Sequence, residues 1–324
     1  MKYILFLQDL EFISRHEARK LLSKAGCRHQ PLWLSDKIEI KKYYRDVEII
    51  VIKEHHVPES LLDQFPNVKM LSLAFTGHNA VNKDFFISRG ISLYYVPGYA
   101  TASVSELNIA LTLSLLRKIP LADTSIRKGN WDTKVFPGVE LANKKVGIIG
   151  TGTIGTATAK LFHAFGCEVN GCSRKENDSF KKYGSYLKKI ELIKKCNIII
   201  MAMELNSETL DFINTKDFKT MQKDTILINA ARNELVNHSA LLNALRTKKI
   251  KAALDYTNDP HGKKIKKSKK KNEDNYLAEL SKLDDVLLTP HIGFKTEEAL
   301  KRLAEITIEN VGHYLKNDST NQLT

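Results

Sequence analysis

Three polar residues in the second half of the sequence have side chains suited to carbonyl chemistry. Arg232 comes soon after the apolar run ILIN (226–229), Asp255 ends AALD (252–255), and His291 follows VLLT (286–289) closely. An arginine can hold a carboxylate through two hydrogen bonds and polarise the neighbouring carbonyl group. A histidine can give a proton to the carbonyl oxygen, and a nearby carboxylate orients the ring and raises its pKa. These residue types are the parts needed to reduce a 2-oxo acid.

A glycine-rich stretch, GTGTIG (150–155), lies between the apolar run VGII (146–149) and a helical pattern. Gly150 permits a tight turn, Gly152 lets the backbone approach a pyrophosphate, and Gly155 lets the helix pack closely on its strand. The motif opens a helix, whose first N–H groups and positive dipole end face the phosphates, and we expect Thr153 and Ile154 to belong to the cofactor site. A strand before the motif and a helix after it indicate a dinucleotide site, with a ligand-free glycine turn as the alternative.

The end of the next apolar run, EVNGC (168–172), bears on which dinucleotide is bound. Sites that prefer NAD usually place an acid there, hydrogen-bonded to the ribose hydroxyls. This sequence has Ser173, Arg174 and Lys175 and no acid. Serine and arginine can bond to a 2′-phosphate, which a carboxylate would repel. We therefore expect NADP to be preferred, with NAD possible; the alternative is that Arg174 and Lys175 are solvated loop charges.

These residues need a framework of strands and helices. In the first hundred residues, short runs rich in β-branched and aromatic residues (KYILFL, EIIVI, VKMLSLAF, SLYYV) alternate with helical patterns. A second alternating series begins at Lys145 and predicts six strands: 146–149, 168–172, 198–202, 226–229, 252–255 and 286–289. This rhythm is typical of α/β folds with parallel sheets, whose ligands bind outside the carboxyl ends of the strands. The motifs all follow such ends.

The linking segments set the domain boundaries. An apolar helix is predicted at 103–116, a polar and irregular arm at 120–141, and a closing helix at 297–315. We expect two Rossmann-like doubly wound parallel-sheet domains flanking a cleft: a substrate domain, 1–99 plus 293–324, and a dinucleotide-binding domain, 100–292. The arm either packs on a partner subunit or is a simple surface excursion.

Composition narrows the class of protein. No apolar run approaches the ~20 residues needed to cross a bilayer, and the start is unlike a secretory signal. The four cysteines have no CxxC spacing, so we expect reduced thiols in a cytoplasmic protein without a metal. The net charge is +13, but KKIKKSKKK (263–271) supplies seven lysines, and +13 minus 7 leaves +6. This run is a solvated loop, a positive field for acidic substrates or partners, or a nuclear-localisation-like signal.

Several motifs, in order, resemble the D-isomer-specific 2-hydroxyacid dehydrogenase family, especially its glyoxylate/hydroxypyruvate reductase-like members. The resemblance covers residues 71–320, and the first seventy residues match only in pattern. The stretches that carry it are AFTGHNAV (74–81), VPGYATASVSEL (96–107), LANKKVGIIGTGTIG (141–155), LINAARNELVN (227–237), AALD (252–255) and LLTPHIGFKTEEA (287–299).

The resemblance implies a role for each matching position. Arg232 matches the substrate-binding arginine and His291 the acid/base histidine. Asp255 matches the aspartate that binds the nicotinamide carboxamide, and Ala230 also belongs to the cofactor site. The turn Thr76-Gly77-His78 matches the loop whose backbone N–H groups meet the substrate carboxylate. The implied activity is hydride transfer between NAD(P)H and a small 2-oxo or 2-hydroxy acid, glyoxylate- or hydroxypyruvate-like, in a homodimer.

The sequence departs from the family pattern at three positions. The family's glutamate before proline is replaced by Asp259 before Pro260, one residue earlier. Asp259 is the expected partner of His291, with a shorter reach that a water molecule can bridge. Glu204 stands where relatives usually have proline, and Asn233 stands where glycine is common.

Two readings from other classes remain as alternatives. The first is a dinucleotide-sensing binding protein, like the family's transcriptional corepressors; Arg232, His291 and the missing ribose-binding acid weigh against it. The second is nucleic-acid binding through the lysine run, which lacks the interleaved aromatic residues that make a stacking platform. We therefore expect neither a nucleic-acid partner nor a membrane partner.

Overall fold

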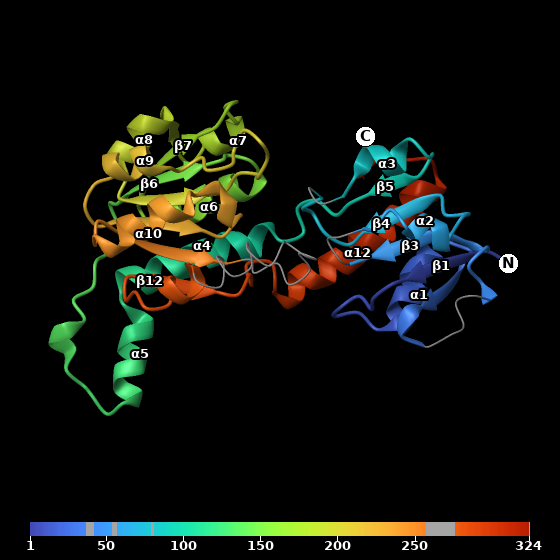
Figure 1. The fold of residues 1–324 in the computed structure, drawn as a ribbon, viewed down its shortest axis with the longest axis horizontal. Coiled ribbons are helices and arrows are strands. Elements are labelled where there is room, and N and C mark those ends of the chain that lie inside the picture. The colour runs from blue at the N-terminus through green and yellow to red at the C-terminus, as the bar shows by residue number, and fades with distance from the viewer. Residues whose placement is uncertain (37–41, 54–56, 79–80, 257–275, 324) are drawn as a thin grey trace. The chain divides into compact units, whose positions relative to one another are not determined.

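The computed structural model of the chain describes residues 1–36, 42–53, 57–78, 81–256 and 276–323 (Figure 1). Asp259 and the lysine-rich run 263–271 lie outside these ranges. The described chain forms two compact units, Met1–Ala100 with Lys295–Thr324 (the first unit) and Thr101–Phe294 (the second unit). These boundaries lie one to two residues from the domain limits expected above.

The first unit is built on a six-stranded sheet of the order β13-β5-β4-β3-β1-β2. Five strands run parallel, and only β13 pairs antiparallel, with β5. Four strands fall in the predicted apolar runs, whereas β2 and β13 were not predicted. The strands are β1 (Tyr3–Phe6), β2 (Gln30–Trp33), β3 (Val47–Ile52), β4 (Met70–Leu73), β5 (Ser92–Tyr94) and β13 (Gln322–Leu323).

Helices cover both faces of this sheet because the strands are apolar on both sides. Helices α1 (Arg15–Lys24) and α12 (Glu297–Leu315) pack over one face, where Ile308 and Val311 join Ile4 and Phe6 in one buried cluster. The short helices α2 (Leu61–Gln64) and α3 (Lys83–Ile87) belong to the cluster on the other face. The closing helix therefore completes the core of the amino-terminal hundred residues.

The second unit is built on a seven-stranded parallel sheet of the order β12-β11-β10-β9-β6-β7-β8. Its order reverses between β6 and β9, the switch point at which doubly wound sheets bind ligands. The six predicted strands are present, and β8, only two residues long, is an addition. The strands are β6 (Lys145–Ile149), β7 (Glu168–Cys172), β8 (Ser185–Tyr186), β9 (Ile198–Met201), β10 (Thr225–Asn229), β11 (Ile250–Asp255) and β12 (Val286–Thr289).

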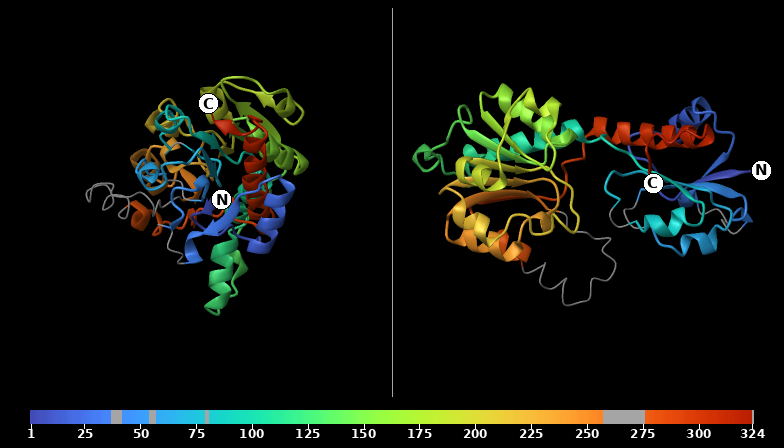
Figure 2. Two further views of the ribbon diagram at one scale, coloured as in Figure 1. Left: turned by 90° about the vertical axis from the view of Figure 1, so that its right-hand side faces the viewer. Right: turned by 90° about the horizontal axis from the view of Figure 1, so that it is seen from above.

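Two layers of helices enclose this sheet (Figure 2). Helices α4 (Thr101–Leu116) and α6 (Thr153–Ala164) share a buried cluster with one face, while α8 (Lys189–Lys195), α9 (Thr215–Thr220) and α10 (His238–Arg246) share a cluster with the other. The short helix α7 (Asp178–Lys181) precedes β8. Because the central strands are buried on both faces, nearly every residue in them is apolar.

The arm of the second unit differs from the expected irregular segment. It forms a helix, α5 (Ile119–Arg127), and a turn of 3₁₀ helix at Thr133–Val135. Pro120 lies in the first turn of α5, where its missing N–H group costs no hydrogen bond. No residue of α5 is buried, and in Figure 1 the arm extends away from sheet and helices of its unit.

Candidate active site and dinucleotide site

The glycine-rich turn connects β6 to α6 at the switch point of the sheet. Gly150 has a φ of +97°, and a Cβ there would lie 2.4 Å from the carbonyl oxygen of Ala202, at the end of β9. A Cβ on Gly155 would lie 1.9 Å from the carbonyl oxygen of Gly150. Gly150 and Gly155 are thus required by the fold, whereas a Cβ on Gly152 would meet no described atom within 4 Å. Thr153 and Ile154 are the first two residues of α6.

The end of β7 carries the three residues expected at the adenosine ribose. Ser173 accepts a hydrogen bond from the Thr151 hydroxyl, at 2.9 Å, and donates to the Lys175 carbonyl. Arg174 is 85% exposed and pairs with Glu208 at 3.1 Å. No acid follows β7 directly, so the position that usually bonds ribose hydroxyls has no carboxylate.

A hydrogen-bond chain beneath this turn was not found from the sequence. The Tyr186 hydroxyl donates to the Thr151 hydroxyl at 2.8 Å, and the Asn177 backbone N–H donates to the Tyr186 oxygen at 2.8 Å. The Asn177 side chain also donates to the Thr151 carbonyl at 2.8 Å. These contacts join the glycine-rich turn to β8, and no short sequence motif marks them.

His291 lies on the loop that follows β12, and its backbone is in the left-handed region with a φ of 51°. Its ring is 5.4 Å from the ring of Phe294. Burial, followed by the charge of Arg232, lowers the pKa of the His291 imidazole, while Asp255 acts in the opposite direction through its charge and its backbone. His291, Arg232 and Asp255 are therefore electrostatically coupled within one unit.

Arg232 follows β10 and is held through its backbone. Asn229, which is buried at the end of β10, donates to the Arg232 carbonyl at 2.8 Å and accepts from the Ala231 N–H at 3.1 Å. The guanidinium donates to the Ala231 carbonyl at 2.7 Å. Ala230 is buried between these residues. Asn229, which was not singled out from the sequence, thus fixes the backbone from Ala231 to Arg232.

Asp255, at the end of β11, is 2% exposed, and its carboxylate accepts three hydrogen bonds. Oδ1 accepts from the Thr289 hydroxyl at 2.6 Å and the Ile292 N–H at 2.9 Å, and Oδ2 accepts from the Gly293 N–H at 2.7 Å. The carboxylate therefore holds both sides of the His291 loop.

The turn Thr76-Gly77-His78 belongs to the first unit, shortly after β4. The Thr76 hydroxyl donates to the Val96 carbonyl, and the His78 ring meets the Tyr95 ring edge-on at 5.4 Å. Asp259, the expected partner of His291, lies outside the described residues.

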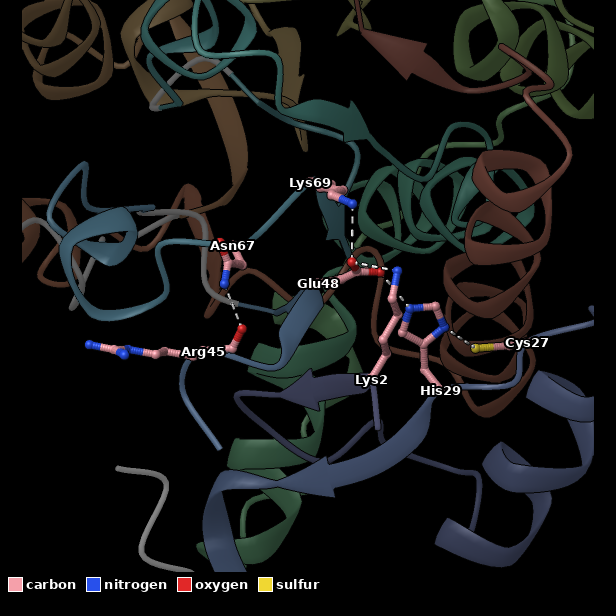
Figure 3. A network of polar contacts seen from close by, with 7 residues as sticks. All are labelled: Lys2, Cys27, His29, Arg45, Glu48, Asn67 and Lys69. Atoms are coloured by element: carbon pink, nitrogen blue, oxygen red, sulfur yellow. Dashed lines mark hydrogen bonds and ion pairs between the residues drawn. The ribbon is translucent and has the colours of Figure 1, made fainter. Parts of the chain in front are cut away.

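The first unit also contains a polar network at the amino-terminal ends of its parallel strands, opposite the ends that lead to the turn Thr76-Gly77-His78 (Figure 3). The Glu48 carboxylate accepts hydrogen bonds from Lys2 at 2.7 Å and from Lys69 at 3.1 Å. The His29 ring lies between this carboxylate and Cys27, with Nε2 3.2 Å from Glu48 Oε2 and Nδ1 3.7 Å from the Cys27 sulfur. Burial opposes the charge of Glu48, but hydrogen bonds from Lys2, Lys69 and His29 outweigh it and lower the pKa of the carboxyl to about 2. The network joins four strands at their amino ends, so we assign it to stability.

Two kinds of feature were not found within the described ranges. No helix there is long and apolar enough to cross a membrane. No group of three or more histidine, cysteine, aspartate and glutamate side chains there is arranged to hold a metal ion.

Comparisons with known proteins agree with this geometry. Residues 109–293 match the sequence model of the family described as D-isomer specific 2-hydroxyacid dehydrogenase, NAD binding domain. An aromatic 2-oxoacid reductase from Clostridium sporogenes is 35% identical over 79% of this chain and 78% of its own. A glyoxylate reductase from Thermococcus litoralis is 31% identical over 85% of this chain and 82% of its own. A solved D-lactate dehydrogenase from Treponema pallidum matches all of both chains with a TM-score of 0.83 and 25% identity.

Proposed function

Because the chain belongs to the D-isomer-specific 2-hydroxyacid dehydrogenase family of NAD(P)-binding 2-oxoacid reductases, we propose how its own residues carry out that reaction and which substrate it takes. One observation carries the proposal. Arg232 and His291 follow β10 and β12, and Asp255 is the last residue of β11. These three strands are neighbours in the sheet that also holds the glycine-rich turn. A cation, a carboxylate and an acid/base group thus share one edge with the dinucleotide site.

The residues at the switch point fit a dinucleotide. Gly152 leaves open space where a side chain would block the approach of a pyrophosphate, and α6 offers free N–H groups to its phosphates. Gly150, Gly152 and the start of α6 would hold the pyrophosphate. The bound cofactor supplies the hydride.

Arg232 and His291 would act on the substrate. The Arg232 guanidinium binds the carboxylate of the 2-oxo acid and polarises its carbonyl, and the His291 imidazolium gives the carbonyl oxygen its proton. The positive charge of Arg232 lowers the pKa of His291. A substrate carboxylate on Arg232 offsets that charge, so substrate binding favours the protonated ring at the moment when it is needed.

For the cofactor, we propose a preference for NADPH over NADH. Ser173, Arg174 and Lys175 follow β7 where an acid would repel a 2′-phosphate. Arg174 can exchange its exposed pair with Glu208 for a charge-assisted bond to that phosphate.

For the substrate, we propose a short 2-oxo acid, with glyoxylate and hydroxypyruvate first. The glyoxylate reductase relative supports this class. Aromatic 2-oxo acids are the second candidates, since the relative with 35% identity is an aromatic 2-oxoacid reductase. We also propose a cytosolic location, which fits the four free thiols of Cys27, Cys167, Cys172 and Cys196.

We further propose a homodimer formed through the arm. Trp131 is 74% exposed, and Ile119, Ile126 and Val135 are each close to half exposed. Such a run of exposed large apolar side chains is typical of a surface that a partner covers. Light scattering should give a molar mass of about 73 kDa, twice the 36.7 kDa of one chain. Trp131→Glu combined with Ile126→Glu should shift it toward the monomer, whereas Ile190→Glu, a similarly exposed site on α8, should not. A monomeric unmodified chain would overturn this proposal.

The reaction is tested by a spectrophotometric panel. The purified protein is mixed with NADPH or NADH and with glyoxylate, hydroxypyruvate, pyruvate, phenylpyruvate or 2-oxoglutarate, and absorbance at the nicotinamide band is followed. Oxidation of NADPH with glyoxylate or hydroxypyruvate is expected. Oxidation with phenylpyruvate alone would select the aromatic class. Tight dinucleotide binding without turnover on any acid would overturn the proposal in favour of a dinucleotide-sensing protein.

A further inference from the structure

The loop that carries His291 is fixed at both ends by a single buried carboxylate. Asp255 accepts from the backbone N–H groups of Ile292 and Gly293, directly after His291, and from the Thr289 hydroxyl, two residues before it. Gly293 allows this closeness, since a Cβ there would lie 3.0 Å from Asp255 Oδ2. The carboxylate has about four acceptor positions, and hydrogen bonds from the described residues occupy three of them.

His291 adopts a backbone conformation that needs such support. Its φ of 51° is in the left-handed region, which is unfavourable for a residue with a Cβ. A strained conformation persists only where its surroundings hold it. The two backbone N–H groups that Asp255 binds belong to the residues immediately after His291, so they fix the direction in which its ring leaves the loop.

Thr289 controls the orientation of that carboxylate. It is the last residue of β12 and lies opposite Asp255 in the parallel ladder, and its own carbonyl accepts from the Tyr256 N–H at 2.8 Å. The sheet therefore fixes the backbone of Thr289, and with it the position from which the hydroxyl donates to Asp255. The hydrogen bond to Oδ1, at 2.6 Å, is short, as expected when the acceptor is ionised.

We propose that Thr289 is a positioning residue for proton transfer: its hydroxyl orients the Asp255 carboxylate, which in turn holds the loop that presents His291. The inference rests on the proposed function, because it takes His291 as the proton donor. It gives Asp255 a task beyond the contact with the nicotinamide carboxamide that family resemblance implies. Without the Thr289 hydroxyl, the carboxylate loses one of the three hydrogen bonds that it accepts from the described residues, and the ring is presented less often in its productive position.

The test compares Thr289→Val, which keeps the shape and removes the hydroxyl, with Thr289→Ser, which keeps the hydroxyl. We expect Thr289→Val to lower kcat roughly tenfold, which is at the lower end of the effects seen when a hydrogen bond that orients a functional side chain is removed. KM for the 2-oxo acid should stay within about twofold, since Arg232 is untouched. The solvent deuterium isotope effect on kcat should rise, because proton transfer becomes slower. Thr289→Ser should recover kcat to within about threefold of the unmodified enzyme.

Three results would overturn the inference: an unchanged kcat and isotope effect in Thr289→Val, equal losses in the valine and serine variants, or a loss seen mainly in KM. If Thr289→Val does not fold, Thr289→Ala is measured in the same way, and failure of both to fold would also overturn it. His291→Ala separates this inference from the proposed function. Normal turnover in His291→Ala defeats the function assigned to His291, whereas a loss there with none in Thr289→Val defeats only the role of Thr289.

Discussion

The preference for NADPH can be tested by removing the cations after β7. In the variant Arg174→Ala with Lys175→Ala, a 2′-phosphate loses its two nearest candidate cations. A hydrogen bond to a charged group contributes about 1.5–3 kcal/mol, but Arg174 is 85% exposed and must first leave Glu208. An exposed ion pair is worth about 0–1 kcal/mol, so about 2 kcal/mol remains for both cations together.

This free energy corresponds to roughly 30-fold weaker NADPH binding. NADH lacks the 2′-phosphate, so its Kd should stay within about twofold. Each Kd is measured by titrating the nicotinamide fluorescence of NADPH and NADH at fixed ionic strength. The discrimination should fall as salt is added, because the charges involved are exposed.

Glu208→Gln provides the matched opposite change. It removes the carboxylate that competes for Arg174, so NADPH should bind about two- to fivefold more tightly while NADH is unaffected. An unchanged ratio of the two Kd values in the double alanine variant would refute the reasoning and place the phosphate contact elsewhere. Weaker NADPH binding in Glu208→Gln would refute the competition between Glu208 and the phosphate.

Three further predictions concern the proton donor His291, the polar network around Glu48, and the glycines of the dinucleotide site. His291→Ala should lower kcat at least ~100-fold while the dinucleotide still binds, as steady-state kinetics and titration will show; near-normal kcat contradicts the acid assignment. Glu48→Gln should cost about 1–2 kcal/mol of unfolding free energy at neutral pH, discounted for the exposed lysines. Because the folded pKa of Glu48 is lowered to about 2, this difference is present above about pH 4.5 and vanishes as the pH falls toward 2; a denaturant series giving a pH-independent difference contradicts it. Gly155→Ala should lower Tm through the 1.9 Å clash, whereas Gly152→Ala should keep Tm and weaken dinucleotide binding; equal Tm losses contradict this division.

The central strands were predictable because they are buried on both faces. In β3, β6, β9 and β10, apolar β-branched residues follow one another closely, and these sequences need two helix layers. Of the four edge strands in the described sheets, β12 was predicted, whereas β2, β8 and β13 gave no such signal. Gln30–Trp33 contains a proline, Ser185–Tyr186 has two residues, and Gln322–Leu323 pairs with a strand more than two hundred residues away. Their pairing depends on tertiary contacts rather than on local pattern.

The helix in the arm was missed for a related reason. Helix α5 has no buried residue, because its apolar side chains Ile119, Leu121 and Ile126 are exposed and do not pack on the core of its unit. The expectation of an irregular segment followed the glycines and prolines that surround it.

The positions of the candidate site residues in the fold were predictable where these residues lie at strand ends. Arg232, Asp255 and His291 are marked by the ends of β10, β11 and β12, and the glycines by their spacing. The residues that position them were not. Asn229 and Thr289 are strand-terminal polar residues, and Tyr186 reaches Thr151 from 35 positions away. Hydrogen bonds of this kind follow from the fold, and one sequence does not reveal them.

The division of the first unit into two segments has a consequence for its biosynthesis. Ile4, Phe6 and Met70 are buried in one cluster with Ile308 and Val311 of α12, and β5 receives its outer neighbour from β13. A ribosome adds about 5–20 residues per second, so the amino-terminal hundred residues wait roughly 10–40 s for these partners while the second unit is translated. The second unit is continuous in sequence and can fold as it emerges from the ribosome. The first unit, although its synthesis begins earlier, therefore completes its fold after the second. During that interval the apolar face of β1, β3 and β4 lacks the cover of α12 and is exposed to association with other apolar surfaces.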